Sequence, residues 1–128
     1  MSKLPKEMNE IELYFFIDAC GGFIWRMNHD MGHGRIPESD HAAIDQDIIK
    51  VREKQMEAVY ELPRIGVLSP LDEHQHPTEE YWAWFRSWDA WKKNLSDDAW
   101  READESVSRG LTEEELAQYK LEAFSSKG

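Results

Sequence analysis

Apolar residues in the first part of the chain recur in a pattern that predicts a helix. The segment from Met8 to Cys20 is apolar nearly all round, as a central helix would be. Pro5 suits the first turn of such a helix, and Gly21 suits the position just after its last turn. The pattern therefore predicts a helix that ends before Gly21.

A β-hairpin is the alternative for the same segment. Its strands would cover residues 11–19 and 23–27, with the turn at Gly21-Gly22. A half-buried strand alternates apolar and polar residues, whereas residues 14–17 are continuously apolar. The helix is favoured for this reason, and an α+β fold with a small hairpin is kept as the alternative.

The second helix is predicted from Ser39, which can cap its start, to Leu62, because Pro63 would stop it. One face, interrupted by Gln55, carries apolar residues: Ile44, Ile48, Val51, Val59 and Leu62. A second apolar stripe lies about 120° away around the helix and consists of Ile49, Met56 and Tyr60. Two stripes predict contacts on two sides, so we expect the second stripe to mediate self-association, as in a homodimer.

A long connection and a Trp-rich helix follow. Prolines mark residues 64–77, directly after Pro63, as the connection, in which residues 64–68 would add a short extended piece. Thr78 is expected to open a helix that runs to about Leu95. The main aromatic residues of this helix fall within an arc of about 120°, which predicts that they form part of the core.

The C-terminal part of the chain carries signals for two more helices. Ser96 begins the first, over residues 96–110, and a capping box begins the second, over residues 112–124. The whole predicts an all-α fold: a single compact bundle of about five helices over residues 1–124, with a frayed tail at residues 125–128.

Composition limits the fold class and the compartment. The 128 residues suit one domain, which should bury roughly two-thirds of its unfolded surface. Aromatic residues make up 12% of the chain and include six Trp, which argues against disorder. Cys20 is the only cysteine, so an internal disulfide is excluded and a cytoplasmic location is expected. No apolar run reaches the ~18 residues of a membrane span, and none resembles a signal peptide.

The net charge narrows the range of partners. With 26 acidic and 15 basic residues, the formal charge is -11, which disfavours nucleic acid and anionic membranes as partners. An acidic cluster follows Ser96 and consists of Asp97, Asp98, Glu102, Asp104 and Glu105. Together with Trp82, which lies outside the main aromatic arc, this cluster is the predicted partner surface, and a basic protein would suit it.

The histidines support an alternative function. His29 and His33 lie four residues apart, so their side chains would share one face of a helix, beside Asp30. Imidazole and carboxylate groups bind divalent Zn, Mn or Fe. Further ligand candidates are His41, His74 and His76.

Residues 29–34, His-Asp-Met-Gly-His-Gly, resemble the His-Asp signature of HD-domain phosphohydrolases. That family is helical and holds its metal with a His, the His-Asp pair and a later Asp. The resemblance implies a metal-dependent hydrolase that uses His29, Asp30 and His33 with a divalent metal as cofactor. The family also uses a His on an earlier helix, and no His precedes His29 in this sequence.

Motifs for nucleophilic catalysis do not occur in the sequence. Cys20 lies in an apolar segment, where a thiol is usually inert. Neither a Gly-x-Ser-x-Gly elbow nor a phosphate-binding glycine loop is present. The sequence therefore predicts a protein without catalytic residues or cofactor, which acts by protein–protein interaction as an inhibitor, immunity or mobile-element accessory protein.

Overall fold

The computed structural model describes residues 4–99, 101, 102 and 105 of the chain. Within these residues the fold is all-α, as the sequence predicts. The three long helices are α1 (Glu10–Gly32), α2 (His41–Val59) and α3 (Glu79–Lys93). Three short 3-10 helices are η1 (Pro5–Glu7), η2 (Glu38–Asp40) and η3 (Leu62–Ile65).

The helix count in the described part of the chain is about four rather than five. The fourth is the predicted helix that starts after Ser96, which is helical at residues 97–99, 101, 102 and 105. Its N-cap is the predicted one, because the Ser96 hydroxyl accepts a hydrogen bond from the Ala99 backbone N–H at 3.2 Å. The last predicted helix, residues 112–124, and the predicted tail lie outside the described residues.

The first helix begins with a capping box. The Asn9 side chain accepts a hydrogen bond from the Glu12 backbone N–H at 3.0 Å, and the Glu12 carboxylate accepts one from the Asn9 N–H at 2.9 Å. The helix then continues through Gly21 and Gly22 to Gly32, so the predicted end at Gly21 and the alternative hairpin are both wrong.

Packing between α1 and α2 explains why the two glycines do not end α1. The Gln55 side chain of α2 donates a hydrogen bond to the Ile17 carbonyl of α1 at 3.0 Å. A Cβ atom on Gly21 would lie 3.4 Å from the Gln55 Nε2 atom, so the glycine fits the crossing between the helices. Glycine lowers helix propensity by about 1 kcal/mol without forbidding a helix, and tertiary contacts offset that cost.

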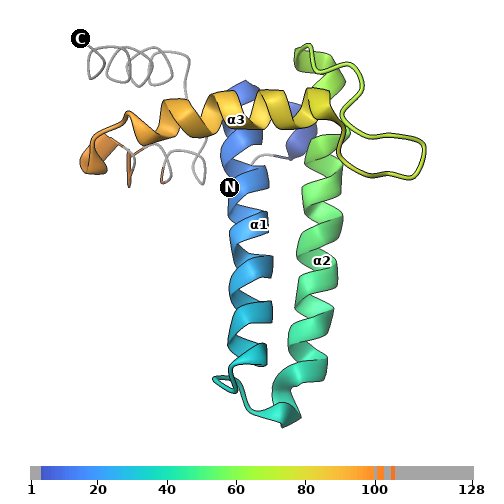
Figure 1. Ribbon diagram of the computed structural model, residues 1–128, viewed down its shortest axis with the longest axis vertical. Helices are drawn as coiled ribbons and strands as arrows, with labels where there is room; N and C mark the ends of the chain where they lie inside the picture. The colour runs from blue at the N-terminus through green and yellow to red at the C-terminus, as the bar shows by residue number, and fades with distance from the viewer. Residues whose placement is uncertain (1–3, 100, 103–104, 106–128) are drawn as a thin grey trace.

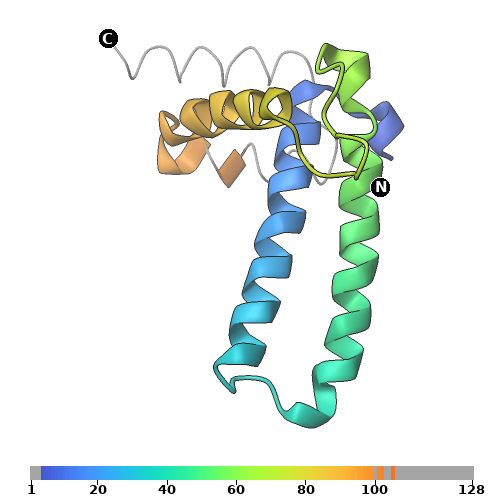
Figure 2. The same ribbon diagram turned by 45° about the vertical axis from the view of Figure 1, so that its right-hand side comes forward.

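α2 lies antiparallel to α1, and the two form a long hairpin (Figures 1 and 2). α2 starts at His41, after η2, rather than at Ser39, and ends at Val59. Pro63 lies inside η3, which replaces the start of the predicted extended piece over residues 64–68. Pro suits the first turn of a 3-10 or α-helix because its missing N–H has no partner there.

α3 lies across one end of the hairpin, where α1 begins and α2 ends (Figures 1 and 2). As predicted, the Thr78 side chain caps its start and accepts a hydrogen bond from the Tyr81 backbone N–H at 3.3 Å. We call this end of the molecule the head (residues 8–20 and 55–99). The remainder of the hairpin, residues 21–54, is the arm.

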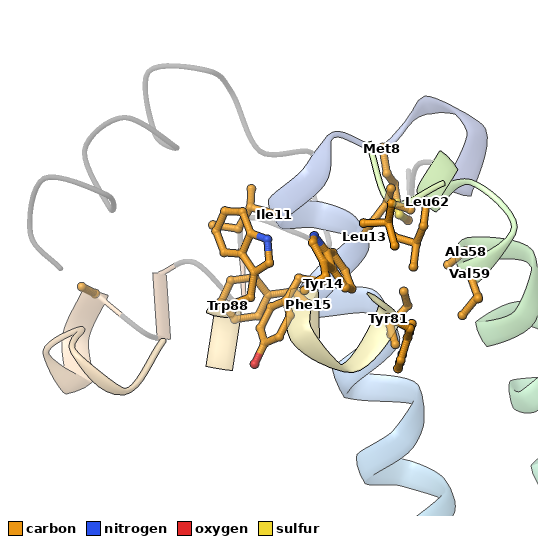
Figure 3. Close-up of a cluster of buried hydrophobic side chains, with 14 residues drawn as sticks. Met8, Ile11, Leu13, Tyr14, Phe15, Ala58, Val59, Leu62, Tyr81 and Trp88 are labelled. Atoms are coloured by element: carbon orange, nitrogen blue, oxygen red, sulfur yellow. The ribbon is translucent and has the colours of Figure 1, made fainter. Parts of the chain in front are cut away.

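The hydrophobic core lies in the head. Side chains from α1, from the end of α2 and from α3 converge there, as Figure 3 shows. The largest fully buried apolar side chains are Ile11, Leu13, Tyr14, Ile17 and Leu62. In the arm, all of which is described, Ile48 is the only buried residue. The apolar residues of the arm are otherwise half-buried or exposed.

Polar contacts fix α3 on α1. The Glu10 carboxylate oxygen Oε1 accepts hydrogen bonds from the indole Nε1 atoms of Trp84 and Trp88, both at 3.0 Å. Two helical turns further along α1, Asp18 forms an ion pair with Lys92 at 2.8 Å. These contacts set the position of α3 along α1, because a shift of one helical turn would separate each pair.

Between these contacts, the Tyr14 hydroxyl donates a hydrogen bond to Asp89 at 3.3 Å. Burial, and then the charges of Asp18 and Asp89, raise the pKa of Tyr14. Partial burial opposes ionisation of Asp89, but the hydrogen bond and charge of Lys93, with the charge of Lys92, lower its pKa overall. Tyr14 is therefore a neutral donor and Asp89 a charged acceptor. None of the described helices is long and apolar enough to cross a membrane.

Candidate interaction surface

The second stripe of α2 lies on the surface of the molecule. The side chain of Ile49 is 49% exposed and that of Tyr60 is 57% exposed, while Met56 is half-buried. These three residues line a shallow hollow of about 350 Å³ together with Arg52, Glu53 and Glu57. Exposed large apolar side chains that gather beside charged ones are typical of interaction sites.

The first stripe of α2 explains why the second is exposed. Ile48, Gln55 and Val59 point toward α1, where Ile48 and Val59 are buried. Helical geometry places Ile49 and Met56 roughly 100° away from that side. No third helix covers the arm within the described residues.

A second hollow, of about 370 Å³, continues the surface toward the head. η1 forms one wall of it, so this short helix lies beside the end of the stripe. Leu4, just before η1, is 54% exposed. Tyr60 is held in place because its hydroxyl donates a hydrogen bond to Gln75 at 2.7 Å. Sequence reasoning missed Leu4, since a single apolar residue before a proline has no periodicity.

The predicted partner surface is divided between the two ends of α3. Trp82, near the start of α3, is 42% exposed. Asp97 and Asp98, beyond its other end, are also exposed. Because α3 has 15 residues, it is about 22 Å long. A partner that contacts both Trp82 and the acidic cluster must therefore cover the length of α3.

The acidic cluster is exposed where the structure describes it. Besides the two aspartates, Glu102 and Glu105 are exposed helical residues, and Asp104 lies outside the described residues. A hollow of about 290 Å³ borders the cluster and is lined by Lys92, Lys93, Leu95 and Asp97. The two lysines already pair with carboxylates of α1 and α3, so they do not neutralise the cluster.

The two histidines of the HD-like segment lie together at the far end of the arm. The ring centroids of His29 and His33 are 4.2 Å apart, and Trp25 stacks on His29 at 4.7 Å. Trp25 is 66% exposed. Sequence reasoning missed this residue, although its position four residues before His29 places it on the same helical face.

Metal ligands do not converge on this histidine pair. Asp30 forms an ion pair with Arg35 at 3.4 Å, and the His41 ring contacts the Ile36 carbonyl at 3.1 Å. His74 and His76 lie in the loop before α3, at the head. Among the described residues, no three side chains are arranged to hold a metal ion. The His-Asp resemblance is therefore local and does not extend to a metal centre in this part of the chain.

The loop that carries His74 and His76 is stabilised by hydrogen bonds within the loop itself. The Asp72 carboxylate accepts hydrogen bonds from the backbone N–H groups of His74 at 2.8 Å and His76 at 2.9 Å. The hydrogen bond from His76, and with it that from His74, lowers the pKa of Asp72. This aspartate therefore organises the turn and needs no metal to explain it.

Cys20 is not activated as a nucleophile. Its side chain is buried, and burial raises the pKa of the thiol, which Lys54 only partly offsets. A thiol with a raised pKa carries little of the reactive thiolate at neutral pH. Cys20 therefore acts as a packing residue, as the sequence predicts.

Comparison with known proteins found no family model that matches this chain, no characterised protein with a similar sequence and no matching solved structure.

Proposed function

We propose that this chain is a non-enzymatic helical protein that acts by protein–protein interaction, with the second stripe of α2 for self-association and the acidic cluster for a protein partner. The observation that carries the proposal is the exposed apolar stripe of α2, with Ile49 and Tyr60 about half exposed over a hollow bordered by charged residues. Apolar surface of this kind costs free energy in water and gains it when a partner covers it.

The acidic cluster gives the proposed partner a chemical character. Asp97, Asp98, Glu102 and Glu105 are exposed, and the whole chain carries a formal charge of -11. A basic protein surface would bind such a cluster with fast, salt-sensitive association. The inhibitor, immunity or mobile-element accessory roles fit this chemistry by analogy only.

Affinity capture from the native source tests the proposal. The tagged wild-type chain is compared with a triple charge reversal that carries Glu102→Lys, Asp104→Lys and Glu105→Lys. We expect the wild-type chain to retain a specific basic protein at low salt and the variant to lose it, because like charges repel across the interface. Circular dichroism checks that the variant keeps its helical signal.

A matched control separates a local surface from net charge. It carries three reversals at exposed acidic positions elsewhere, Glu7→Lys, Asp47→Lys and Glu73→Lys. Both variants change the net charge equally, so only the first should lose the partner. Equal retention of the partner by all three proteins would reject the acidic cluster as the binding surface. Equal loss of the partner by both variants would show that overall charge, and not the acidic cluster, determines binding.

A further inference from the structure

The outward face of α2 repeats every seven residues. Ala42, Ile49 and Met56 lie along its centre, and each is exposed or half-buried. Positions three and four residues after the first two are charged or polar and exposed: Asp45, Gln46, Arg52 and Glu53. A coiled-coil seam carries an apolar residue about every 3.5 residues, so this face is a narrower apolar line, of three residues with polar residues on both flanks, that suits contact with one other helix over a few turns.

This face is symmetric about Ile49. Ala42 and Met56 each lie seven residues from Ile49, on opposite sides. In an antiparallel helix pair with Ile49 at the two-fold axis, Ala42 of each copy lies opposite Met56 of the other. A small side chain then faces a large one, which suits the distance of roughly 8–10 Å between the axes of packed helices.

The charges on the two flanks are also self-complementary. Helical geometry places Asp45 and Arg52 on one flank of the apolar line, and Gln46 and Glu53 on the other. An antiparallel pair brings the same flank of both copies together. Asp45 of one copy then lies about one residue, ~1.5 Å along the axis, from Arg52 of the other. Two such ion pairs form, and Gln46 and Glu53 form two hydrogen-bonding pairs on the other flank.

We propose that α2 binds α2 of a second copy of this chain, antiparallel and with the two Ile49 side chains at the two-fold axis. This pairing rests on the proposed function and deepens it, because it names the occupant of the exposed stripe. Asp45 and Arg52 form no ion pair inside the described part of the chain, so both are available to a second copy.

The position of η1 favours the antiparallel orientation over a parallel one. η1 lies beside Tyr60 and Glu57 at the head end of the stripe, where it lines the second hollow. A parallel pair would place both copies of η1 at the same end of the interface. In the antiparallel pair, residue 38 of the second copy lies opposite Tyr60, so the two copies of η1 lie at opposite ends of the interface.

The incomplete burial of the arm is a second, independent argument for a partner helix. Ile48 is its only buried residue, and among the described elements just α1 and α2 build the arm. Helical domains bury their apolar stripes against further helices. The second copy brings a helix onto the arm and covers Ile49 and Met56.

A charge-swap experiment tests both the contact and its register. Molar mass is measured by light scattering after size exclusion for the full chain, for Asp45→Arg, for Arg52→Asp and for the double variant. Each single variant places like charges at both ion pairs, so we expect dimerisation weakened about tenfold. The double variant restores opposite charges and should regain the wild-type mass.

Mixing the two single variants gives the sharpest outcome. Asp45→Arg and Arg52→Asp proteins are complementary across the two-fold axis, so their heterodimer should form about tenfold more tightly than either homodimer. Asp45 and Arg52 lie two turns apart on one helix, so a rescue between separate chains cannot arise from an intramolecular contact. Failure of the mixture to form a heterodimer would overturn the register.

Cysteine cross-linking tests the orientation in a Cys20→Ala background. Ile49→Cys should form a disulfide with itself on mild oxidation. Ala42→Cys and Met56→Cys should each remain uncoupled alone and should couple when mixed. Self-coupling at all three positions would mean a parallel pair and would overturn the antiparallel arrangement.

Ile49→Asp and Lys50→Asp are the disrupting variant and its matched control. Ile49→Asp buries two carboxylates at the axis and should weaken the dimer roughly 100-fold, while Lys50 lies to the side and its variant should stay dimeric. A wild-type chain that is monomeric at high concentration would overturn the pairing. Partner capture by a monomeric Ile49→Asp protein would still support the proposed function, so the two failures are distinguishable.

Discussion

The head and the arm use the same pair of helices and differ in how much of each helix is covered. In the head, α3 lies across α1, and side chains such as Leu13 and Tyr14 are fully buried. In the arm, α1 and α2 pack on each other with no third helix among the described residues, and Ile48 is the single buried residue of residues 21–54. A third layer of structure is therefore what turns half-buried apolar residues into a core. The comparison predicts that substitutions in the head cost more free energy of unfolding than similar ones in the arm.

The largest expected effect is the removal of a core leucine from the head. Leu13→Ala should lower the free energy of unfolding by about 3 kcal/mol, because a buried side chain leaves a cavity. Ile44→Ala in the arm should cost only about 1 kcal/mol, since Ile44 is half-buried and its site can relax. Urea denaturation of both variants measures the difference, and equal losses would contradict the distinction between the two regions.

The second effect concerns the carboxylate that holds α3 to α1. Glu10→Ala removes the acceptor of two indole N–H groups and should cost about 2 kcal/mol, because two partly buried hydrogen bonds between α3 and α1 are lost. Glu7→Ala, at an exposed position nearby, should change stability by less than about 0.5 kcal/mol. Thermal unfolding followed by circular dichroism distinguishes them, and similar melting temperatures would show that Glu10 does not anchor α3.

A third effect is a loss of stability of the head at alkaline pH. Burial, with a contribution from Asp18, raises the pKa of Tyr81 from 10.0 to about 12. The Tyr81 hydroxyl ionises at a lower pH in the unfolded chain than in the folded one. The stabilisation from neutral Tyr81 is therefore complete below pH 10 and is lost as the pH rises toward 12. The loss should reach about 2 kcal/mol. Tyr81→Phe should remove this part of the pH dependence, as urea denaturation at pH 8 and 11 would reveal. If the free energy of unfolding falls by the same amount between these pH values in the variant and the wild type, Tyr81 does not cause the loss.

The smallest effect is a gain in the arm. Gly22→Ala should stabilise the protein by up to about 1 kcal/mol, because it improves helix propensity and a Cβ atom there would meet nothing within 4 Å. Gly21→Ala should gain less, since its Cβ atom would lie 3.4 Å from Gln55 Nε2. Urea denaturation orders the two variants, and a loss of stability in Gly22→Ala would show that the helix needs its glycine.

Part of the fold and of the candidate surface followed from sequence pattern. The periodicity of α2 separated Ile48 and Val59 from Ile49 and Met56, and the structure buries the first two and leaves Ile49 exposed. The N-caps at Thr78 and Ser96 were also predicted, because a cap depends on a few neighbouring residues. That the second stripe mediates self-association stays a prediction.

The rest depended on contacts between residues far apart in the chain. Gly21 was interpreted as a helix end because nothing in the local sequence reveals that Gln55 packs against that turn. The histidines illustrate the same limit: spacing placed His29 beside His33, but it could not show that the loop with His74 lies at the other end of the molecule.

The sequence by itself determined that the chain is helical, the caps at Thr78 and Ser96, and the net charge, because these depend on propensity, periodicity and composition within a few turns of chain. Only the tertiary structure decided that α3 covers one end of the hairpin, while no described helix covers the other end. That outcome depends on Glu10 meeting Trp84 and Trp88 across more than 70 residues of sequence, and no local pattern encodes a contact between such distant positions. The exposed stripe is a consequence of that placement.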